Sequence, residues 1–199
     1  MAGQESVMTE KEKMLAGELY DCGDPQLMDL WHKGKNLAKA YNALDYSDRA
    51  GQIRILDELL GGRGENTQIT APFFVDYGAF IFLGNNCEVN MNCVFLDCNR
   101  ITIGDNALIA PGVHIYTVFH PIKAGERFHT TTNGGFPFAV SRTAPVTIGN
   151  NVWIGGGAHI MPGVTIGDNV TVGAGSVVTK SLPDSVLAYG NPCKIIRKI

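Results

Sequence analysis

Apolar residues in the C-terminal part of the chain recur at a fixed spacing of six positions. Two positions before each lies a second apolar or small residue, and glycine directly follows four of the six. This spacing fits neither the 3.6-residue period of a helix nor the two-residue alternation of an ordinary strand. It predicts a solenoid in which three hexads close a coil of about 18 residues. The positions are Ile148, Ile154, Ile160, Ile166, Val172 and Val178.

The same pattern extends upstream, to about residue 63. Its members there are Leu83, Val89 and Phe95, and then Ile103, Ile109 and Ile115. Between these two sets the phase slips by two residues, at 97–99. A β-sandwich with short strands is the alternative, but its spacing would drift with loop length, whereas this spacing is constant within each run. We therefore expect a mainly β chain with a solenoid over residues 63–190 and a tail over 191–199.

Residues 1–62 show the signals of helices. Thr9 and Glu12 match a capping box for a first short helix, and Asp24-Pro25 matches an N-cap followed by proline at the first helical position. We expect Ser47 to cap a third helix that ends at Gly61-Gly62. The predicted apolar faces hold Leu27, Leu30, Trp31, Gly34, Leu37, Ala38 and Tyr41 in the second helix, and Ile53, Leu56, Leu59 and Leu60 in the third.

Composition argues against several classes of function. The net charge of −3 gives no reason to expect nucleic acid or an anionic membrane as a partner. No apolar run reaches the roughly 18 residues of a membrane span, and the N-terminal residues lack the apolar core of a signal peptide, so we predict a cytoplasmic protein. The odd number of cysteines and the absence of a C-x-x-C pair indicate reduced, packed thiols. They are Cys22, Cys87, Cys93, Cys98 and Cys193.

A polar excursion over residues 116–145 interrupts the repeat, and it carries His120-Pro121. An excursion of this length is uncommon unless it is functional, because loops bind and react while a repetitive scaffold holds them. Proline restricts the residue before it, which fixes His120 at the exit of a rigid coil. A neutral imidazole can remove the proton of an attacking hydroxyl at neutral pH. A loop histidine without a role is the alternative interpretation.

Several segments together resemble the maltose and galactoside O-acetyltransferases among the hexapeptide-repeat acyltransferases. In chain order they are EKMLAGELYD, VDYG, VNMNCVFLDC, ITIGDNALIAPGVHIYT, TVFHP, VTIGNNVWIGG and GNPCKIIRKI. The resemblance runs from about residue 8 to the end. Hexapeptide repeats alone specify a superfamily, whereas the N-terminal segment and the ordered set are more specific. The resemblance implies a left-handed parallel β-helix, acetyl-CoA as the donor, no metal, and a homotrimer with active sites between subunits.

The resemblance also implies roles for single residues. His120 matches the general base of direct acetyl transfer in a ternary complex, without a covalent acyl-enzyme. The implied acceptor contacts are Asp76, Asn90, Asp97 and Asp21. Asparagine ladders and turn capping are the alternative roles for such residues. Galactoside enzymes carry an aspartate one residue after the position of Asp97, where this chain has Cys98, so the identity of the acceptor stays open.

For the donor, the resemblance implies a groove between coils of two subunits, in which small residues bind pantetheine and basic residues bind phosphates. The implied coenzyme A contacts are Asn90, Trp153, Gly156, Ala174, Thr179, Lys180, Lys194 and Arg197. Solvated surface charge is the alternative for the basic residues, and a subunit contact is the alternative for Trp153. A zinc site of the kind found in carbonic anhydrases of this fold would need His114, His120 and His129, whose spacing is not that of a ligand set.

We therefore expect an acetyl-CoA-dependent O-acetyltransferase that acts on a hydroxyl of a sugar. Acetylation of an antibiotic or an amino sugar is a rival enzymatic function, although such relatives generally lack the N-terminal helical segment. A trimeric binding scaffold with a vestigial site is the rival outside enzymes, and the intact set of Asn90, His120 and Lys180 argues against it. His114 and His159 each precede an inward isoleucine, so we expect both to face outward, at the surface or at a subunit contact.

Overall fold

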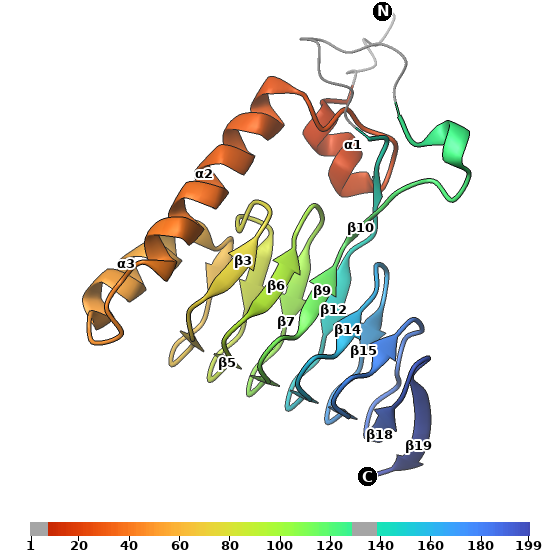
Figure 1. The fold of residues 1–199 in the computed structure, drawn as a ribbon. Helices are drawn as coiled ribbons and strands as arrows, with labels where there is room; N and C mark the ends of the chain where they lie inside the picture. Colours follow the sequence, from red (N-terminus) through yellow and green to blue (C-terminus); the bar gives the residue numbers. More distant parts are fainter. Residues whose placement is uncertain (1–7, 129–138) are drawn as a thin grey trace, which may run out of the picture.

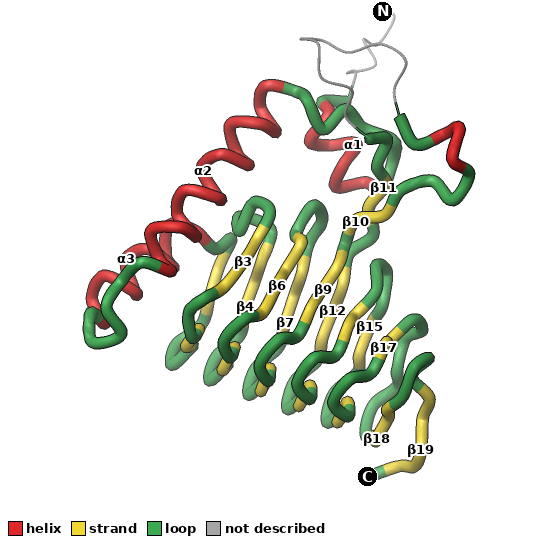
Figure 2. Tube along the Cα trace, viewed as in Figure 1, coloured by secondary structure: helices red, strands yellow, loops and turns green. Residues whose placement is uncertain are grey.

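The computed structural model describes residues 8–128 and 139–199. They form a parallel β-solenoid with a helical segment along its N-terminal coils (Figure 1). Each coil adds one short strand to each of three sheets, and the turns between strands stack into straight edges (Figure 2). The predicted solenoid is confirmed. We number the sheets I, II and III in the order in which the chain enters them.

The strands of the three sheets follow one another along the solenoid axis. Sheet I holds β1 (Gly62–Arg63), β4 (Ile81–Leu83), β7 (Ile101–Ile103), β12 (Val146–Ile148) and β15 (Thr165–Ile166). Sheet II holds β2 (Gln68–Ile69), β5 (Glu88–Val89), β8 (Leu108–Ile109), β13 (Trp153–Ile154), β16 (Thr171–Val172), β18 (Val186–Tyr189) and β19 (Lys194–Lys198). Sheet III holds β3 (Phe73–Val75), β6 (Cys93–Leu96), β9 (His114–Tyr116), β14 (His159–Ile160) and β17 (Val177–Val178).

The hexad register determines which residues form the core. Ile101, Ile115, Ile154 and Ile160 have 0% exposed surface, because each points into the solenoid between two stacked neighbours. The coil length is not constant. Neighbouring coils are 18 residues apart in the C-terminal part and 20 apart in the N-terminal part, where turns between sheets III and I are longer. The predicted length of 18 therefore holds only for part of the C-terminal half, because the last step, from Asp168 to Asp184, is 16 residues.

Asparagines stack along the edge where sheet I passes into sheet II. Their side-chain amides form a ladder with N–O distances of 3.0–3.2 Å, and their backbone φ angles are 55–58°. Asparagine tolerates this left-handed conformation better than other non-glycine residues, and its amide has both a donor and an acceptor for its neighbours. The ladder contains Asn66, Asn86, Asn106, Asn151 and Asn169.

Three helices precede the solenoid. In α1 (Glu10–Ala16) the capping box of Thr9 and Glu12 is present, and Asp24 caps α2 (Pro25–Asn42) as predicted. The predicted cap of α3 (Arg49–Leu59) is wrong. Asp48 caps this helix by accepting from the Gly51 N–H at 2.9 Å. Ser47 belongs instead to a turn in which its N–H and hydroxyl both donate to Asp45.

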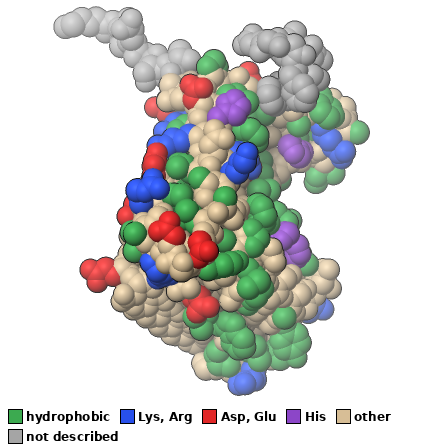
Figure 3. Space-filling view, turned by 60° about the vertical axis from the view of Figure 1, so that its left-hand side comes forward, with side chains coloured by type: hydrophobic (Ala, Val, Ile, Leu, Met, Phe, Trp, Pro, Cys, Tyr) green, Lys and Arg blue, Asp and Glu red, His purple; other side chains and the backbone are tan. Residues whose placement is uncertain are grey.

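The apolar face predicted for α3 is also partly wrong. Ile53 is 47% exposed, whereas Ile55 is buried against the first coils together with Leu56 and Leu59. The helix therefore packs on the solenoid through the face that carries Ile55, Leu56 and Leu59. On the solvent-exposed side of the two helices, Lys33 Nζ of α2 lies 3.8 Å from Glu58 Oε1 of α3. Charged side chains of both signs are mixed over the helical part of the surface (Figure 3).

The excursion leaves sheet III after β9 and returns to sheet I at β12. Its two arms, β10 (Val118–Phe119) and β11 (Arg142–Thr143), pair antiparallel, and a short 3₁₀ turn (Ala124–Glu126) lies beyond them. Asn99 ties the base of the excursion to α1: its amide donates to Thr143 Oγ1 and to the carbonyls of Met14 and Leu15. Among the described residues, no helix has the length and apolar character needed to cross a membrane.

Candidate active site

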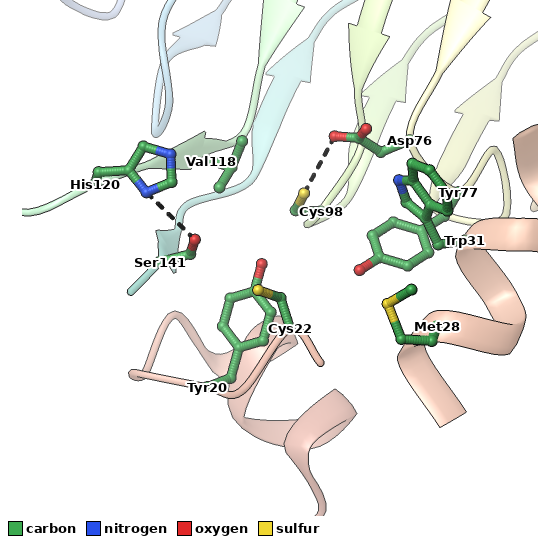
Figure 4. Close-up of a pocket in the computed structure, with 10 residues that line it drawn as sticks. All are labelled: Tyr20, Cys22, Met28, Trp31, Asp76, Tyr77, Cys98, Val118, His120 and Ser141. Carbon is green, nitrogen blue, oxygen red and sulfur yellow. Dashed lines mark hydrogen bonds between the residues drawn. The ribbon is translucent and has the colours of Figure 1, made fainter. Parts of the chain in front are cut away.

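A pocket of about 300 Å³ opens where the helical segment meets the edge between sheets III and I, which we call the III–I edge. Three walls enclose it: the residues between α1 and α2 with the first turns of α2, the turn after β3 with the end of β6, and the two arms of the excursion (Figure 4). The lining residues are Tyr20, Cys22, Met28, Trp31, Asp76, Tyr77, Cys98, Val118, His120 and Ser141.

His120 lies at the end of β10 and is held in one orientation. Its Nδ1 is 2.8 Å from the carbonyl oxygen of Val140 and 3.4 Å from the Ser141 hydroxyl. A carbonyl oxygen can only accept, so we assign the proton to Nδ1. Nε2 then carries a free lone pair, on the side of the ring that is turned away from Ser141 (Figure 4). A histidine held in this tautomer is prepared to accept a proton through Nε2.

Asp76 lines the pocket opposite His120, and both of its carboxylate oxygens have partners. Oδ1 accepts from Lys35 Nζ of α2 at 3.0 Å, and Oδ2 lies 3.3 Å from the Cys98 thiol. Lys35 Nζ also lies 5.2 Å from the centre of the Trp31 ring, a cation–π contact. The predicted acceptor contact Asp76 is therefore at the pocket, with its charge balanced by Lys35.

Asp97 lies behind this wall and is fully buried. Its carboxylate accepts from the backbone N–H groups of Asp76, Tyr77 and Phe80 at 2.9–3.2 Å. Burial raises the pKa of Asp97 to about 7, and the backbone hydrogen bonds of this turn oppose that rise. Among the described residues, Asp97 is covered on all sides, so its carboxylate does not contact an acceptor in the pocket. The geometry gives it a positioning role, since it fixes the turn that carries Asp76 and Tyr77.

The floor of the pocket is made of neutral aromatic and sulfur groups. Burial raises the pKa of Tyr20 and of Tyr77, so both hydroxyls remain protonated at neutral pH. Burial, with the nearby Asp76 carboxylate, also raises the pKa of Cys98 well above its usual range. Burial raises the pKa of Cys22 as well. None of these groups therefore adds charge to the pocket at neutral pH.

The predicted donor contacts lie partly on another edge of the solenoid. Asn90, Gly156 and Ala174 occupy turns between sheets II and III, along the border that we call the II–III edge. The backbone N–H groups of Gly156 and Ala174 have no hydrogen-bond partner within the described part of the chain. Trp153 is 54% exposed on sheet II, and with Asn90 it lines a shallow pocket of about 190 Å³.

The basic residues expected at the nucleotide end are all exposed. Thr179 and Lys180 follow β17 and so lie on the III–I edge, the edge from which the excursion carries His120. Lys194 and Arg197 lie on β19, the antiparallel edge strand of sheet II. Within one chain, the predicted donor contacts therefore lie apart from one another, on the II–III edge with the neighbouring face of sheet II, on the III–I edge and on β19.

Asp21 does not line the pocket. Its carboxylate accepts from the Gly23 N–H at 2.8 Å, and its own N–H donates to Glu10, so it shapes the turn that presents its neighbour Cys22. His114 and His159 face outward from sheet III, as expected, with their rings 4.8 Å apart. Within residues 8–128 and 139–199 no group of three or more His, Cys, Asp or Glu is arranged to hold a metal. His129 lies outside the described residues.

Sequence reasoning missed most of the wall that the helical segment contributes. Tyr20, Met28 and Trp31 were not candidates, although the apolar face predicted for the second helix included Trp31. Only the position of Cys22, next to Asp21 in a region expected to meet the acceptor, was a signal. Tyr20 pairs by a β-bridge with Ser141, far along the sequence, and no local pattern predicts such a contact.

Two family models match the chain. The maltose acetyltransferase hexapeptide capping motif matches residues 13–64, and the bacterial transferase hexapeptide model, with six repeats, matches residues 145–180. A Saccharomyces cerevisiae protein that is named as an acetyltransferase without a stated substrate is 46% identical over 189 residues, which cover 94% of this chain and 92% of the yeast protein.

Solved structures agree with these matches. A maltose O-acetyltransferase from Clostridium difficile is similar with a TM-score of 0.88 and 44% identity, over 96% of this chain and 98% of that one. A galactoside acetyltransferase in complex with coenzyme A is similar with a TM-score of 0.88 and 38% identity, over 97% of this chain and 92% of that one.

Proposed function

This chain belongs to the maltose and galactoside acetyltransferase family of hexapeptide-repeat transferases, and we propose that it moves the acetyl group of acetyl-CoA to a hydroxyl of a sugar. The observation that carries the proposal is the 2.8 Å contact between His120 Nδ1 and the Val140 carbonyl oxygen, at a pocket large enough for a small acceptor. The contact assigns the proton to Nδ1 and leaves Nε2 to act as the base. The pocket is at the lower end of the roughly 300–1,000 Å³ typical of ligand sites.

The proposed reaction is a direct transfer. Nε2 of His120 takes the proton of the acceptor hydroxyl while the hydroxyl oxygen attacks the thioester carbon. A carbon–oxygen bond forms, the carbon–sulfur bond breaks, and coenzyme A leaves as a thiolate that takes the proton back from His120. The Val140 carbonyl holds the Nδ1 proton throughout, and it stabilises the imidazolium that exists between these proton transfers. General base catalysis of this kind contributes roughly 10²–10⁴-fold in rate.

We further propose that the acetyl donor binds between subunits of a homotrimer. The predicted contacts lie on opposite borders of sheet III. The III–I edge carries His120 and Lys180, and the II–III edge carries Asn90, Gly156 and Ala174. A second copy of the chain is therefore needed to bring one border beside the other. The N–H groups of Gly156 and Ala174, which have no partner among the described residues, can donate to the amide carbonyls of pantetheine. Exposed large apolar side chains near the II–III edge, Met91, Leu108 and Trp153, support a covered surface there. Figure 3 shows hydrophobic side chains gathered on one part of the face it presents.

Thiol release from acetyl-CoA, with the acetylated product identified by mass spectrometry, tests the proposed reaction. The acceptor panel holds maltose, glucose, galactosides, amino sugars and a streptogramin. Transfer to a sugar hydroxyl supports the proposal. Transfer only to an amine or to the antibiotic would replace the acceptor, and coenzyme A binding without any transfer would favour a binding scaffold.

Mixing two inactive variants tests the shared site. His120→Ala and Asn90→Ala chains are unfolded, mixed and refolded together. If each site takes His120 from one subunit and Asn90 from another, mixed trimers contain intact sites and activity returns to a substantial fraction of wild type. No recovery in verified mixed trimers would place both residues in a site within one chain.

A further inference from the structure

The outward face of sheet III carries two histidines in an otherwise apolar column. The parallel register aligns one outward residue from each of five successive coils, and the strands that carry the histidines, β9 and β14, lie side by side (Figure 1). The column consists of Phe74, Val94, His114, His159 and Val177. Phe74 is 47% exposed, and the other four are half-buried. Such a column favours contact with another surface, and that contact would leave both imidazoles in need of a polar partner.

The two imidazoles are close enough to share one ligand. Their ring centres are 4.8 Å apart, with an angle of 69° between the ring planes. Two imidazoles that bind one ion through nitrogens at about 2.0–2.1 Å, in a near-tetrahedral arrangement, have ring centres about 5 Å apart. The spacing of His114 and His159 therefore fits a shared metal ion. An ordinary edge-to-face pair of rings has a similar spacing, so the distance needs support from a second contact.

Tyr116 supplies that second contact. Its hydroxyl oxygen lies 2.6 Å from Nδ1 of His114, and its ring stacks on His159 with ring centres 6.0 Å apart. When the hydroxyl accepts the Nδ1 proton, Nε2 of His114 carries the lone pair that a metal ion needs. Metal-binding histidines almost always donate their other ring N–H to a fixed acceptor in this way. Tyr116 therefore stands where a residue that orients a metal ligand is expected.

The homotrimer proposed above would turn this face towards its axis. If the III–I edge of one copy meets the II–III edge of the next, both borders of sheet III lie at contacts. In cross-section each copy is a triangle, and three triangles joined at these two corners close only with sheet III inward, because the third corner of each would otherwise cross the axis. The histidine pairs of three copies then gather around the axis. Partner side chains and water can fill the positions that two imidazoles leave open on a tetrahedral ion.

We propose that His114 and His159 bind a divalent transition metal ion such as Zn²⁺, with Tyr116 orienting His114, and that the ion stabilises the contact between copies. Imidazole suits Zn²⁺, Ni²⁺ and Cu²⁺, whereas Mg²⁺ and Ca²⁺ prefer oxygen ligands. None of the three residues lines the pocket beside His120, so the ion has no part in the proposed acetyl transfer. The contribution of partner copies rests on the proposed function, whereas the pair within one chain does not.

The test uses untagged protein that has been stripped of metal with a chelator, and Zn²⁺ alone is the probe, in competition with a chromophoric chelator. Wild type should bind about one Zn²⁺ per chain, and the ion should raise its thermal midpoint. Tyr116→Phe keeps the ring but removes the acceptor for the Nδ1 proton, so it should weaken binding about 10–100-fold. His159→Val, which continues the apolar column, should weaken it at least as much. His32→Gln, at the histidine of α2, is the matched control and should bind Zn²⁺ as wild type does.

Equal Zn²⁺ affinity in wild type and His159→Val would overturn the inference, and the two rings would then be an ordinary edge-to-face pair. Wild-type affinity in Tyr116→Phe would overturn the role of Tyr116. The same protein is assayed for acetyl transfer, which separates this inference from the proposed function. If Zn²⁺ binds through the pair and no acetyl group is transferred, the inference stands and the proposed function fails. If a trimer transfers acetyl groups and its Zn²⁺ binding does not depend on the pair, the proposed function stands and the inference fails.

Discussion

Asn99 offers the sharpest test of how the helical segment is fixed to the solenoid. Its side chain is 2% exposed and contacts three parts of the chain. The amide donates to the carbonyls of Met14 and Leu15 at the end of α1 and to Thr143 Oγ1 of β11, at 2.9–3.3 Å. Its oxygen accepts from the Arg100 N–H at 2.7 Å. Replacing Asn99 removes the connection between α1, the excursion and the coil at once.

The cost follows from which groups lose their partner. In Asn99→Ala the Met14 carbonyl keeps its hydrogen bond from the Thr143 hydroxyl, but the Leu15 carbonyl and the Arg100 N–H lose the partner described here. Two such groups at roughly 1–3 kcal/mol each predict a loss of about 2–6 kcal/mol in the free energy of unfolding. Asn99→Asp has the same size but turns a carboxylate oxygen towards two carbonyls, so it should be at least as destabilising.

Urea unfolding measures the global loss, and hydrogen exchange of the α1 amides measures local detachment. We expect exchange in α1 to rise first, with a higher KM for the acceptor and unchanged affinity for coenzyme A, because α1 supports Tyr20 at the pocket. The reasoning is refuted if Asn99→Ala changes the unfolding free energy by less than about 0.5 kcal/mol, the scale of an ordinary surface substitution, and leaves α1 protected.

Three further predictions concern packing, backbone conformation and pH. A Cβ added at Gly34 would lie 2.2 Å from the Tyr77 carbonyl oxygen, so Gly34→Ala should lower the unfolding free energy by at least about 1–3 kcal/mol in urea. Asn106 has a left-handed backbone, with φ 58°. Asn106→Ala should lower the unfolding free energy by about 1–2 kcal/mol for this conformation, and further through the lost ladder hydrogen bonds. Asn106→Gly should lower it less in the same assay, because glycine adopts this φ without strain. Burial and the neighbouring His159 lower the pKa of His114, so the unfolded chain binds this proton more readily than the folded one. The thermal midpoint should therefore fall as the pH drops below about 6.5, the ordinary pKa of histidine. His114→Gln should make the thermal midpoint less dependent on pH in this range.

The solenoid could be predicted from the sequence because its rule is local. Each inward Ile or Val stacks on the equivalent residue of the next coil, so the period of six is the structure itself. The helix caps at Thr9 and Asp24 were equally local, and both were correct. Ser47 failed because two adjacent residues, Ser47 and Asp48, both have capping side chains, and Asp45 takes the first.

The pocket could not be predicted in the same way, because its walls come from segments that are distant in sequence. The sequence indicated His120 through the break in the repeat, but not the carbonyl of Val140 that fixes its tautomer. Asp97 was expected to meet the acceptor, and its burial became visible only when the turn at 76–80 was seen folded over it. The docking of α2 decides that Trp31 faces a pocket, and no periodicity in the helix contains that information.

Acetyl transfer by His120→Ala is the measurement that tests the central claim most directly. The variant is first shown to keep the wild-type oligomeric state, thermal midpoint and coenzyme A affinity. Thiol release with the best acceptor should then fall at least about 100-fold in kcat, with the acceptor KM little changed, because the imidazole acts in the reaction step. Turnover within a few-fold of wild type would contradict the account, since the base would then have to be another group.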